Sequence, residues 1–225
     1  MRRRLGASMR IGCVVMASGE GRRFAEALAC EGVPTQRVLS GRGEGGKLAA
    51  LLGGIPLIER TVRSVLAAGE RAPFDIVVST RWHEVARRCE RLGVRVALHD
   101  GGLRSESVRA GLSVGLDRWD GCLFLPGDQP LVSPKSFEGL YAAFASDPHA
   151  AVRLGCEGAP GSPVLFPARL FPELMHLSGT QGGGAVLSQA GRVGIVEASS
   201  PIELMDVDTP CDLAVLERWL PEAAG

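Results

Sequence analysis

A short glycine-containing stretch near the start of this chain could bind phosphate. The apolar run 11–16 ends in Ala17, Ser18, Gly19, Glu20 and Gly21, followed by Arg22 and Arg23. Small residues and glycines let a backbone turn tightly and aim amide N–H groups at anionic oxygens. Arginines beside such a turn add forked donors that fit phosphate. The stretch predicts a nucleotide phosphate site, with an ordinary strand-to-helix turn as the alternative.

Lys47 is one of only two lysines in a chain that has 23 arginines. A composition so biased toward arginine leaves lysine where a compact point charge is required, so we predict that Lys47 contacts phosphate. The alternative is a solvated loop lysine. Residues 41–47 also fit the pattern G-x-x-x-x-G-K, but Leu48 stands where that motif needs Ser or Thr for magnesium, so it is kept only as an alternative. A dinucleotide fingerprint fails because Phe24 replaces its third glycine.

Carboxylates in two later segments could hold a metal ion. Asp128 follows the apolar run 120–125, and Mg²⁺ prefers few protein oxygens together with phosphates and waters. We therefore predict that Asp128 binds Mg²⁺, with capping of the following turn as the alternative. Asp206 and Asp208 would face the same side of an extended segment and could supply further ligands. Thr209 also indicates the start of a helix, and both roles are compatible.

Hydroxyl groups cluster in the segment 101–112, where a helix is expected to begin. Ser105 and Ser107 could contact the edge of a nucleotide base, or one of them could cap the helix. The residues alone do not separate these two roles.

Alternating apolar runs and amphipathic patterns must position these motifs. Strands are expected over 11–16, 74–79, 94–98 and 120–125, and helices over 56–68, 82–92, 105–116, 134–145 and 210–220. This alternation predicts a three-layer α/β fold with a mostly parallel, Rossmann-like sheet. Ligands of such folds bind at the carboxyl ends of the strands, which is where the glycine stretch and Asp128 are expected. The pattern loosens after residue 150, and the last helix is expected to pack on the sheet.

The overall composition excludes several classes of partner. Basic and acidic residues number 25 each, so no net field attracts nucleic acid or a membrane surface. The six cysteines are scattered singly, without a metal knuckle or a disulfide framework, which indicates reduced thiols and a cytoplasmic location. We find no apolar segment long enough for a signal or a membrane span.

Together the motifs resemble those of the MobA-like nucleotidyltransferase superfamily and, within it, the molybdenum cofactor cytidylyltransferase branch. The matching segments, in order, are 16–24, 47–48, 53–57, 60–62, 104–112, 125–130, 161–166, 177–183 and 206–210. The resemblance spans about residues 10–220. Two features depart from the family pattern. Ser18 replaces an alanine, and 23 residues (24–46) separate Arg23 from Lys47, where the family has only a few.

The resemblance implies transfer of CMP from CTP to the phosphate of a molybdopterin acceptor, with Mg²⁺ and release of pyrophosphate. It implies catalytic roles for Arg23, Lys47 and Asp128, nucleotide binding by Ala17, Ser18, Gly19, Gly21, Arg23, Lys47, Ser105 and Ser107, and metal binding by Asp128, Asp208 and Asp206. The alternatives are use of GTP, a sugar- or polyol-phosphate acceptor, or a non-catalytic nucleotide- or cofactor-binding protein that serves a molybdenum enzyme. We expect residues 1–9 to form a flexible basic arm, 10–220 one nucleotidyltransferase domain, and 24–46 an inserted mobile loop.

Overall fold

A computed structural model of the chain describes residues 9–31 and 45–220. Its strands are β1 (Ile11–Met16), β2 (Leu51–Leu52), β3 (Ile55–Pro56), β4 (Asp75–Thr80), β5 (Arg95–Leu98), β6 (Gly121–Pro126), β7 (Ala151–Cys156), β8 (Ala159–Pro167) and β9 (Val193–Glu197). Its α-helices are α1 (Arg22–Glu31), α3 (Leu57–Leu66), α4 (His83–Arg91), α5 (Arg104–Ser113), α6 (Pro134–Ser146), α7 (Phe171–Met175), α8 (Gly184–Leu187) and α9 (Pro210–Glu217). Short 3₁₀ turns cover Gly46–Ala49, Gly69–Arg71, Ala168–Leu170 and Pro201–Leu204.

Seven strands form one sheet in the order β5-β4-β1-β6-β8-β7-β9. The pairs β4–β5, β1–β4, β1–β6 and β7–β9 are parallel, whereas β6–β8 and β7–β8 are antiparallel. The predicted mostly parallel sheet is therefore confirmed. The antiparallel hairpin β7–β8 was not predicted, because Gly155, Gly158 and Gly161 interrupt the apolar periodicity there.

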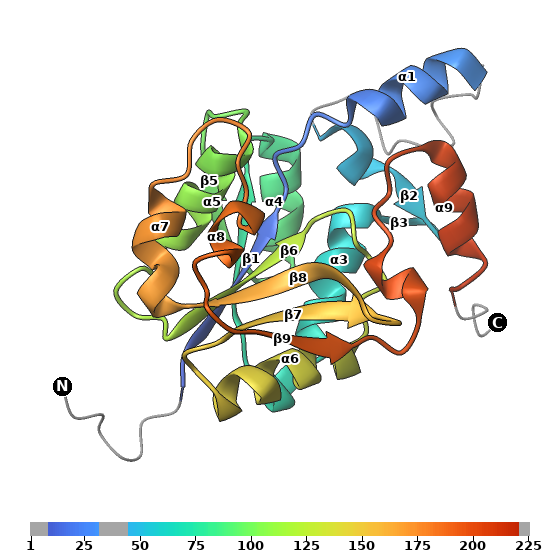
Figure 1. Cartoon of the computed structure of the whole chain (residues 1–225). Helices are drawn as coiled ribbons and strands as arrows, with labels where there is room; N and C mark the ends of the chain where they lie inside the picture. The colour runs from blue at the N-terminus through green and yellow to red at the C-terminus, as the bar shows by residue number, and fades with distance from the viewer. Residues whose placement is uncertain (1–8, 32–44, 221–225) are drawn as a thin grey trace.

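Apolar layers cover both faces of this sheet, as a three-layer α/β fold requires. Cys13 and Val15 of β1 point into a core shared with α3, α4 and α6, whereas Val14 points into a second core with α5 and α7. Figure 1 shows these two groups of helices on opposite sides of the strands. The alternation explains why β1 reads as an unbroken apolar run, because it is buried on both faces.

The last helix does not pack on the seven-stranded sheet as expected. Leu213 and Leu216 of α9 join a third, smaller core with Phe24 and Leu28 of α1 and with residues around the β2–β3 hairpin. In Figure 1, α1, α9 and the hairpin lie together, beyond the carboxyl end of β1. This cluster positions two segments that carry site residues, one before α9 and one at the start of α1.

The expected insertion begins as a helix. Residues 24–31 belong to α1, and Phe24 is only 2% exposed, because it fills the small core beside α9. Residues 32–44 of the insertion, and residues 1–8 of the expected arm, lie outside the described residues. Met9, which we had placed in the arm, packs against the main core and accepts a hydrogen bond from Tyr141 through its carbonyl. No helix within the described ranges is long and apolar enough to cross a membrane.

Candidate active site

A cavity of about 900 Å³ opens at the carboxyl ends of β1 and β6. Its lining comes from the β1–α1 loop, the Lys47 turn, α5, the end of β6, β8, the loop before α8 and the segment before α9. Of the predicted site residues it includes Ser18, Gly19, Gly21, Arg23, Lys47, Ser107, Asp128, Asp206 and Asp208. Residues from seven distant parts of the sequence therefore converge where ligands of parallel sheets bind.

The glycine stretch and the Lys47 turn, which lie on either side of the expected insertion, meet in this cavity. Gly21 has a positive φ of 64°, and a Cβ there would lie 3.2 Å from the backbone nitrogen of Lys47. Gly46 also has a positive φ of 50°, and its Cβ position is 3.0 Å from the carbonyl oxygen of Glu20. Only glycine combines this backbone conformation with so close an approach. Lys47 thus lies beside the glycine stretch despite the 23 intervening residues.

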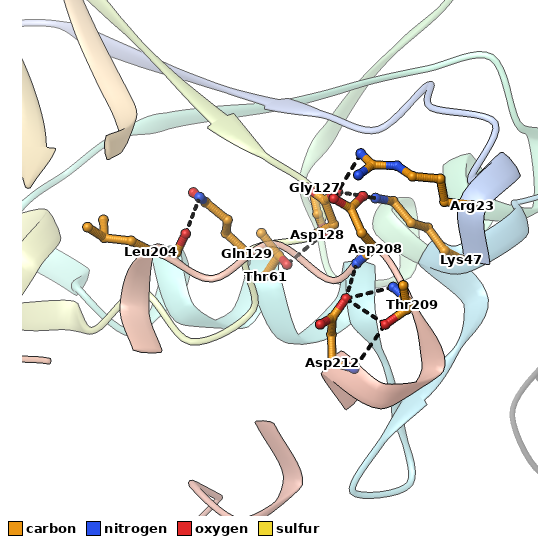
Figure 2. Close-up of polar contacts among 10 residues, drawn as sticks. All are labelled: Arg23, Lys47, Thr61, Gly127, Asp128, Gln129, Leu204, Asp208, Thr209 and Asp212. Atoms are coloured by element: carbon orange, nitrogen blue, oxygen red, sulfur yellow. Dashed lines mark hydrogen bonds and ion pairs between the residues drawn. The ribbon is translucent and has the colours of Figure 1, made fainter. Parts of the chain in front are cut away.

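Lys47 lies between two carboxylates. Its Nζ is 2.5 Å from Asp128 Oδ2 and 2.9 Å from Asp208 Oδ1. Arg23 reaches the other oxygen of the same residue, with Nη2 2.9 Å from Asp208 Oδ2. Figure 2 shows the two cations converging on the acidic pair. The chain therefore brings together all three residues predicted to be catalytic.

Hydrogen bonds from the backbone hold these carboxylates in place. The amide of Val207 donates to the carbonyl of Asp128 at 3.0 Å, which ties the turn after β6 to the segment before α9. Asp212 accepts from the backbone N–H groups of Asp208 at 2.9 Å and Thr209 at 2.7 Å, so the capping box of α9 also fixes Asp208 (Figure 2). Thr209 therefore caps α9 as predicted, while Asp208 lies in the cavity.

Gly127 makes the close contact that brings β6 beside β1. Its N–H donates to the carbonyl of Met16 at 3.0 Å, and a Cβ at this position would lie 2.8 Å from the same oxygen. Thr61 of α3 donates to the carbonyl of Gly127 at 2.8 Å. The tip of β6 is thereby pinned on two sides, and Asp128 projects from a fixed turn.

The acidic side of the site is only partly neutralised. Desolvation of its carboxylate and the negative charges of Asp128 and Asp208 together raise the pKa of Asp206 to about 6, against the opposing effect of Lys47. Burial alone would lower the pKa of Lys47, but the adjacent Asp128 and Asp208 outweigh it and raise that pKa above its usual value. Lys47 is therefore a permanent cation, and the three carboxylates retain an attraction for further positive charge.

A divalent cation fits this donor set. Asp128 and Asp208 present oxygens to one point, now contacted by the Lys47 ammonium, and Asp206 adds unneutralised charge beside them. Oxygen ligands of this kind, completed by phosphates and waters, suit Mg²⁺. No ready-made group of three or more His, Cys, Asp or Glu ligands occurs among the described residues.

Two predicted nucleotide contacts lie outside the cavity lining. Ser105 is fully buried, and its hydroxyl donates to the carbonyl of Gly179 at 2.9 Å, so it anchors the loop before α8. Ala17 is also fully buried; its N–H donates to Ser79 and its carbonyl accepts from Thr80. Both residues support the walls of the site, and neither is exposed to a ligand.

Sequence reasoning did not single out three other residues at the site. Arg104 and Thr180 line the cavity, and His99 contacts the hydroxyls of Ser18 and Ser107. Arg104 could have been predicted, because it is the first residue of the matched segment 104–112, where a helix was expected to begin. His99 was not, because its role depends on which strands become neighbours.

Comparisons with known proteins agree with this geometry. The sequence matches the family model of the MobA-like NTP transferase domain over residues 13–193. The purine catabolism protein PucB of Bacillus subtilis is 32% identical over 116 residues, which cover 51% of this chain and 54% of PucB. A 3-deoxy-manno-octulosonate cytidylyltransferase of Desulfosudis oleivorans is 31% identical over 106 residues, which cover 46% and 42% of the two chains. The chain thus spans about half the length of these curated relatives.

Solved structures share the fold over nearly the whole chain. A nucleotidyl transferase from Methanothermobacter thermautotroptrophicus superposes with a TM-score of 0.75 at 27% identity, covering 94% of this chain and 98% of that one. Rv0371C of Mycobacterium tuberculosis, solved in complex with manganese, has a TM-score of 0.62 at 21% identity and covers 94% and 100%. A CMP:2-keto-3-deoxy-manno-octonic acid synthetase complexed with CTP has a TM-score of 0.63 at 15% identity and covers 93% and 98%. With the family model matched over most of its length, the chain belongs to the MobA-like NTP transferase domain family.

Proposed function

We propose that this protein is a nucleotidyltransferase that moves CMP from CTP to the phosphate of a molybdopterin-type acceptor and releases pyrophosphate. The observation that carries the proposal is the convergence of Arg23 and Lys47 with Asp128 and Asp208 beside the glycine stretch. Cations and amide donors suit a triphosphate, and the carboxylates suit the metal that accompanies it. Together they fit phosphoryl-type transfer, in which catalysis rests on alignment and charge stabilisation.

The reaction requires little proton chemistry from the protein. An oxygen of the acceptor phosphate is already anionic, so it forms the new bond to the α-phosphorus of CTP without a general base. The bond from the α-phosphorus to its bridging oxygen breaks, and pyrophosphate leaves with the electron pair. Lys47 and Arg23 would hold the triphosphate and balance the charge on the departing group. Mg²⁺ bound to Asp128, with Asp208 or Asp206, would neutralise charge on the phosphates.

The relatives support the choice of CTP. Ser107 is a buried residue of the cavity lining, and its hydroxyl could contact the edge of a base. One curated relative is a cytidylyltransferase, and one structure of this fold holds CTP. Since the acceptors in those two names are sugar acids, a sugar- or polyol-type acceptor is the second candidate. A molybdenum enzyme that receives the product is expected only if the acceptor is of the molybdopterin type.

The cellular setting is part of the same proposal. The cysteines Cys13, Cys89 and Cys122 are free and buried, and burial raises the pKa of the Cys89 thiol to about 12, so that this thiol stays protonated. Free thiols are typical of a reducing compartment, which supports a cytoplasmic location.

Pyrophosphate release from each of the four NTPs, with and without molybdopterin and Mg²⁺, tests the proposal. We expect CTP to be used at least tenfold more efficiently than GTP, a difference of about 1.4 kcal/mol. Equal use of both nucleotides would contradict the cytidylyl assignment. Tight nucleotide binding without pyrophosphate release would favour a non-catalytic delivery protein.

Paired lysine variants connect this activity to the site. Lys47→Ala should weaken triphosphate binding and lower turnover, because it removes the buried cation next to the phosphate loop. Lys135→Ala is the matched control, since Lys135 is the only other lysine and is exposed on α6. Equal effects of the two substitutions would remove Lys47 from the mechanism.

A further inference from the structure

His99 joins two parts of the cavity that are far apart in the sequence. It follows β5, and its Nε2 lies 2.8 Å from Ser18 Oγ and 3.3 Å from Ser107 Oγ. Ser18 belongs to the β1–α1 loop and Ser107 to the first turns of α5, and both line the cavity. Both are nearly inaccessible, with 6% and 2% exposure. The ring therefore lies within hydrogen-bonding distance of two residues that line the cavity.

The backbone fixes where this ring lies. The N–H of His99 donates to the carbonyl of Thr80 at 3.1 Å, which extends the β4–β5 pairing by one residue. Ser79, the neighbour of Thr80, donates through its hydroxyl to the carbonyl of Ser107 at 2.7 Å. The end of β4 thus makes hydrogen bonds both to the backbone of His99 and to α5. A side chain whose backbone is paired with a strand is positioned more precisely than one on an unpaired loop.

One ring nitrogen facing two hydroxyls controls which hydrogen-bonding group each hydroxyl offers. The Ser18 hydroxyl also lies 3.3 Å from the carbonyl of Ser79, to which it can only donate. Within the described part of the chain, the Ser107 hydroxyl has His99 as its hydrogen-bond partner. If Ser107 accepts from Nε2–H, its own proton is free for a ligand; if it donates to Nε2, a lone pair is free instead. In the first case Ser107 can contact only an acceptor on the edge of a base, and in the second only a donor.

The surroundings of the ring favour its neutral form. Burial lowers the pKa of His99 below its usual value, and the nearby Arg81 lowers it further, against opposing effects of Glu106, Asp100 and a hydrogen bond to the backbone of Gly101. A neutral imidazole has one donor and one acceptor nitrogen, whereas the cation only donates. The tautomer of the ring therefore decides whether Nε2 donates to the serine hydroxyls or accepts from them.

We propose that His99 is a positioning residue that fixes the positions of Ser18 and Ser107 relative to each other. The glycine stretch around Ser18, which would bind the phosphates, and the start of α5 around Ser107, which would contact the base, then recognise one nucleotide together. The inference rests on the proposed function in one respect, that the cavity binds an NTP with its base near Ser107. The family motif carries alanine where Ser18 stands, so matching motifs does not reveal this contact. His99 acts through the two serines and is not itself a catalytic residue.

Two substitutions separate a positioning role from mere packing. In His99→Gln the side-chain amide reaches about as far as Nε2 and can still hydrogen-bond, whereas His99→Asn is too short to reach either serine. We expect His99→Asn to weaken CTP binding on the order of tenfold and to reduce the preference for CTP over GTP, because lost hydrogen bonds at a buried site are costly. His99→Gln should stay within about threefold of the unmodified protein. His149→Asn is the control, since His149 is exposed.

Isothermal titration calorimetry with CTP and GTP measures these affinities, and thermal unfolding confirms that each variant is folded. Equal binding by both His99 variants and the unmodified protein would overturn the proposal. Equal losses in both variants, with the same fall in melting temperature, would assign His99 to packing and would overturn it as well. Failure of the unmodified protein to bind any NTP would instead contradict the proposed function.

A second measurement tests the bridge without any nucleotide. The chain has four histidines, so long-range ¹H–¹⁵N correlation spectra of the imidazole rings can be assigned by single substitutions. Ser18→Ala and Ser107→Ala should each shift the Nε2 resonance of His99 and leave those of His149 and His176 unchanged. Unchanged His99 resonances in both variants would show that the bridge does not exist in solution.

Discussion

At the scale of single residues, the charges of the site are uneven. Asp128, Asp206 and Asp208 bring three carboxylates into the cavity, and Lys47 and Arg23 bring two cations to them. Arg23 is 74% exposed, so water screens its ion pair and the pair contributes little stability. Lys47 is only 11% exposed and interacts more strongly. Two cations thus face three carboxylates in this cluster, which supports the proposal that the carboxylates hold a metal ion.

Asp128 should be required for turnover and dispensable for folding. We expect Asp128→Asn to lower kcat by on the order of 100-fold or more, because it removes a metal oxygen and a partner of Lys47. The turn itself is held by the contacts of Gly127 and so should persist. Asp117→Asn is the control, since Asp117 is exposed between α5 and β6. Activity close to normal at limiting Mg²⁺, or loss of the thermal unfolding transition, would contradict this role.

Asp206 should make folding stability depend on pH in a defined direction. Its folded-state pKa is raised from 3.8 to about 6, so the folded protein holds this proton more tightly than the unfolded chain. Stability therefore falls as pH rises from about 4 to 6, and the cost persists above pH 6. Asp206→Asn removes the cost, so its stability relative to the unmodified protein should be higher at pH 8 than at pH 4. Because Asp206 is exposed, solvent screening limits the change to about 1 kcal/mol.

Urea unfolding at intervals between pH 4 and pH 8 measures this difference. Asp117→Asn again serves as the control and should show no such pH dependence. A stability difference that is constant across the range would mean that the folded-state pKa of Asp206 is not raised.

At the scale of helices and strands, regular periodicity allowed most elements to be predicted. The runs that became β1, β4, β5 and β6 are apolar and bounded by polar or glycine residues, and the helices between them have clear apolar faces. After residue 150 this reasoning failed, because β9 is largely exposed and carries no buried pattern. The packing of α9 was predicted wrongly, since its apolar residues do not specify whether a sheet or another helix covers them.

The packing of α1 against α9 gives a prediction at this scale. Phe24→Ala should destabilise the protein by about 3 kcal/mol, because Phe24 fills the small core with Leu213 and Leu216. It should also weaken triphosphate binding, since α1 positions Arg23 beside Asp208. Glu26→Ala changes an exposed residue of the same helix and should stay within about 0.5 kcal/mol. Chemical denaturation and nucleotide titration report the two effects separately; an unchanged midpoint would show that α1 does not pack as described.

At the scale of the whole molecule, the individual motifs were readable from the sequence but their connections were not. The glycine stretch, Lys47 and Asp128 each carry a local signal, and all three lie in one cavity. The ion pair between Lys47 and Asp208 joins residues 161 positions apart, and no local pattern specifies it. His99 went unnoticed and Ser105 was assigned to the ligand for the same reason: their partners depend on the final placement of β5 and α8.

The site as a whole should couple binding of the metal to binding of the nucleotide. Lys47 and Arg23, which would hold phosphates, are paired with Asp128 and Asp208, which would hold Mg²⁺. A triphosphate alone must draw the cations away and leave the carboxylates unpaired, and Mg²⁺ alone must compete with an ammonium group. Each ligand relieves the cost of binding the other. Coupling of this kind is reciprocal, so each should raise the affinity of the other by the same factor.

We expect that factor to be at least tenfold, about 1.4 kcal/mol, when CTP binding is titrated with and without Mg²⁺. Magnesium also binds free CTP, so the titration must be repeated with Asp208→Asn, which leaves that solution equilibrium unchanged. In this variant Lys47 keeps its ion pair with Asp128, whereas Arg23 loses its carboxylate partner. The coupling should therefore fall toward the value that results from binding of Mg²⁺ to free CTP alone. Asp117→Asn should retain the full coupling. If Asp208→Asn also retains it, the paired charges of Asp208 are not what links the two ligands.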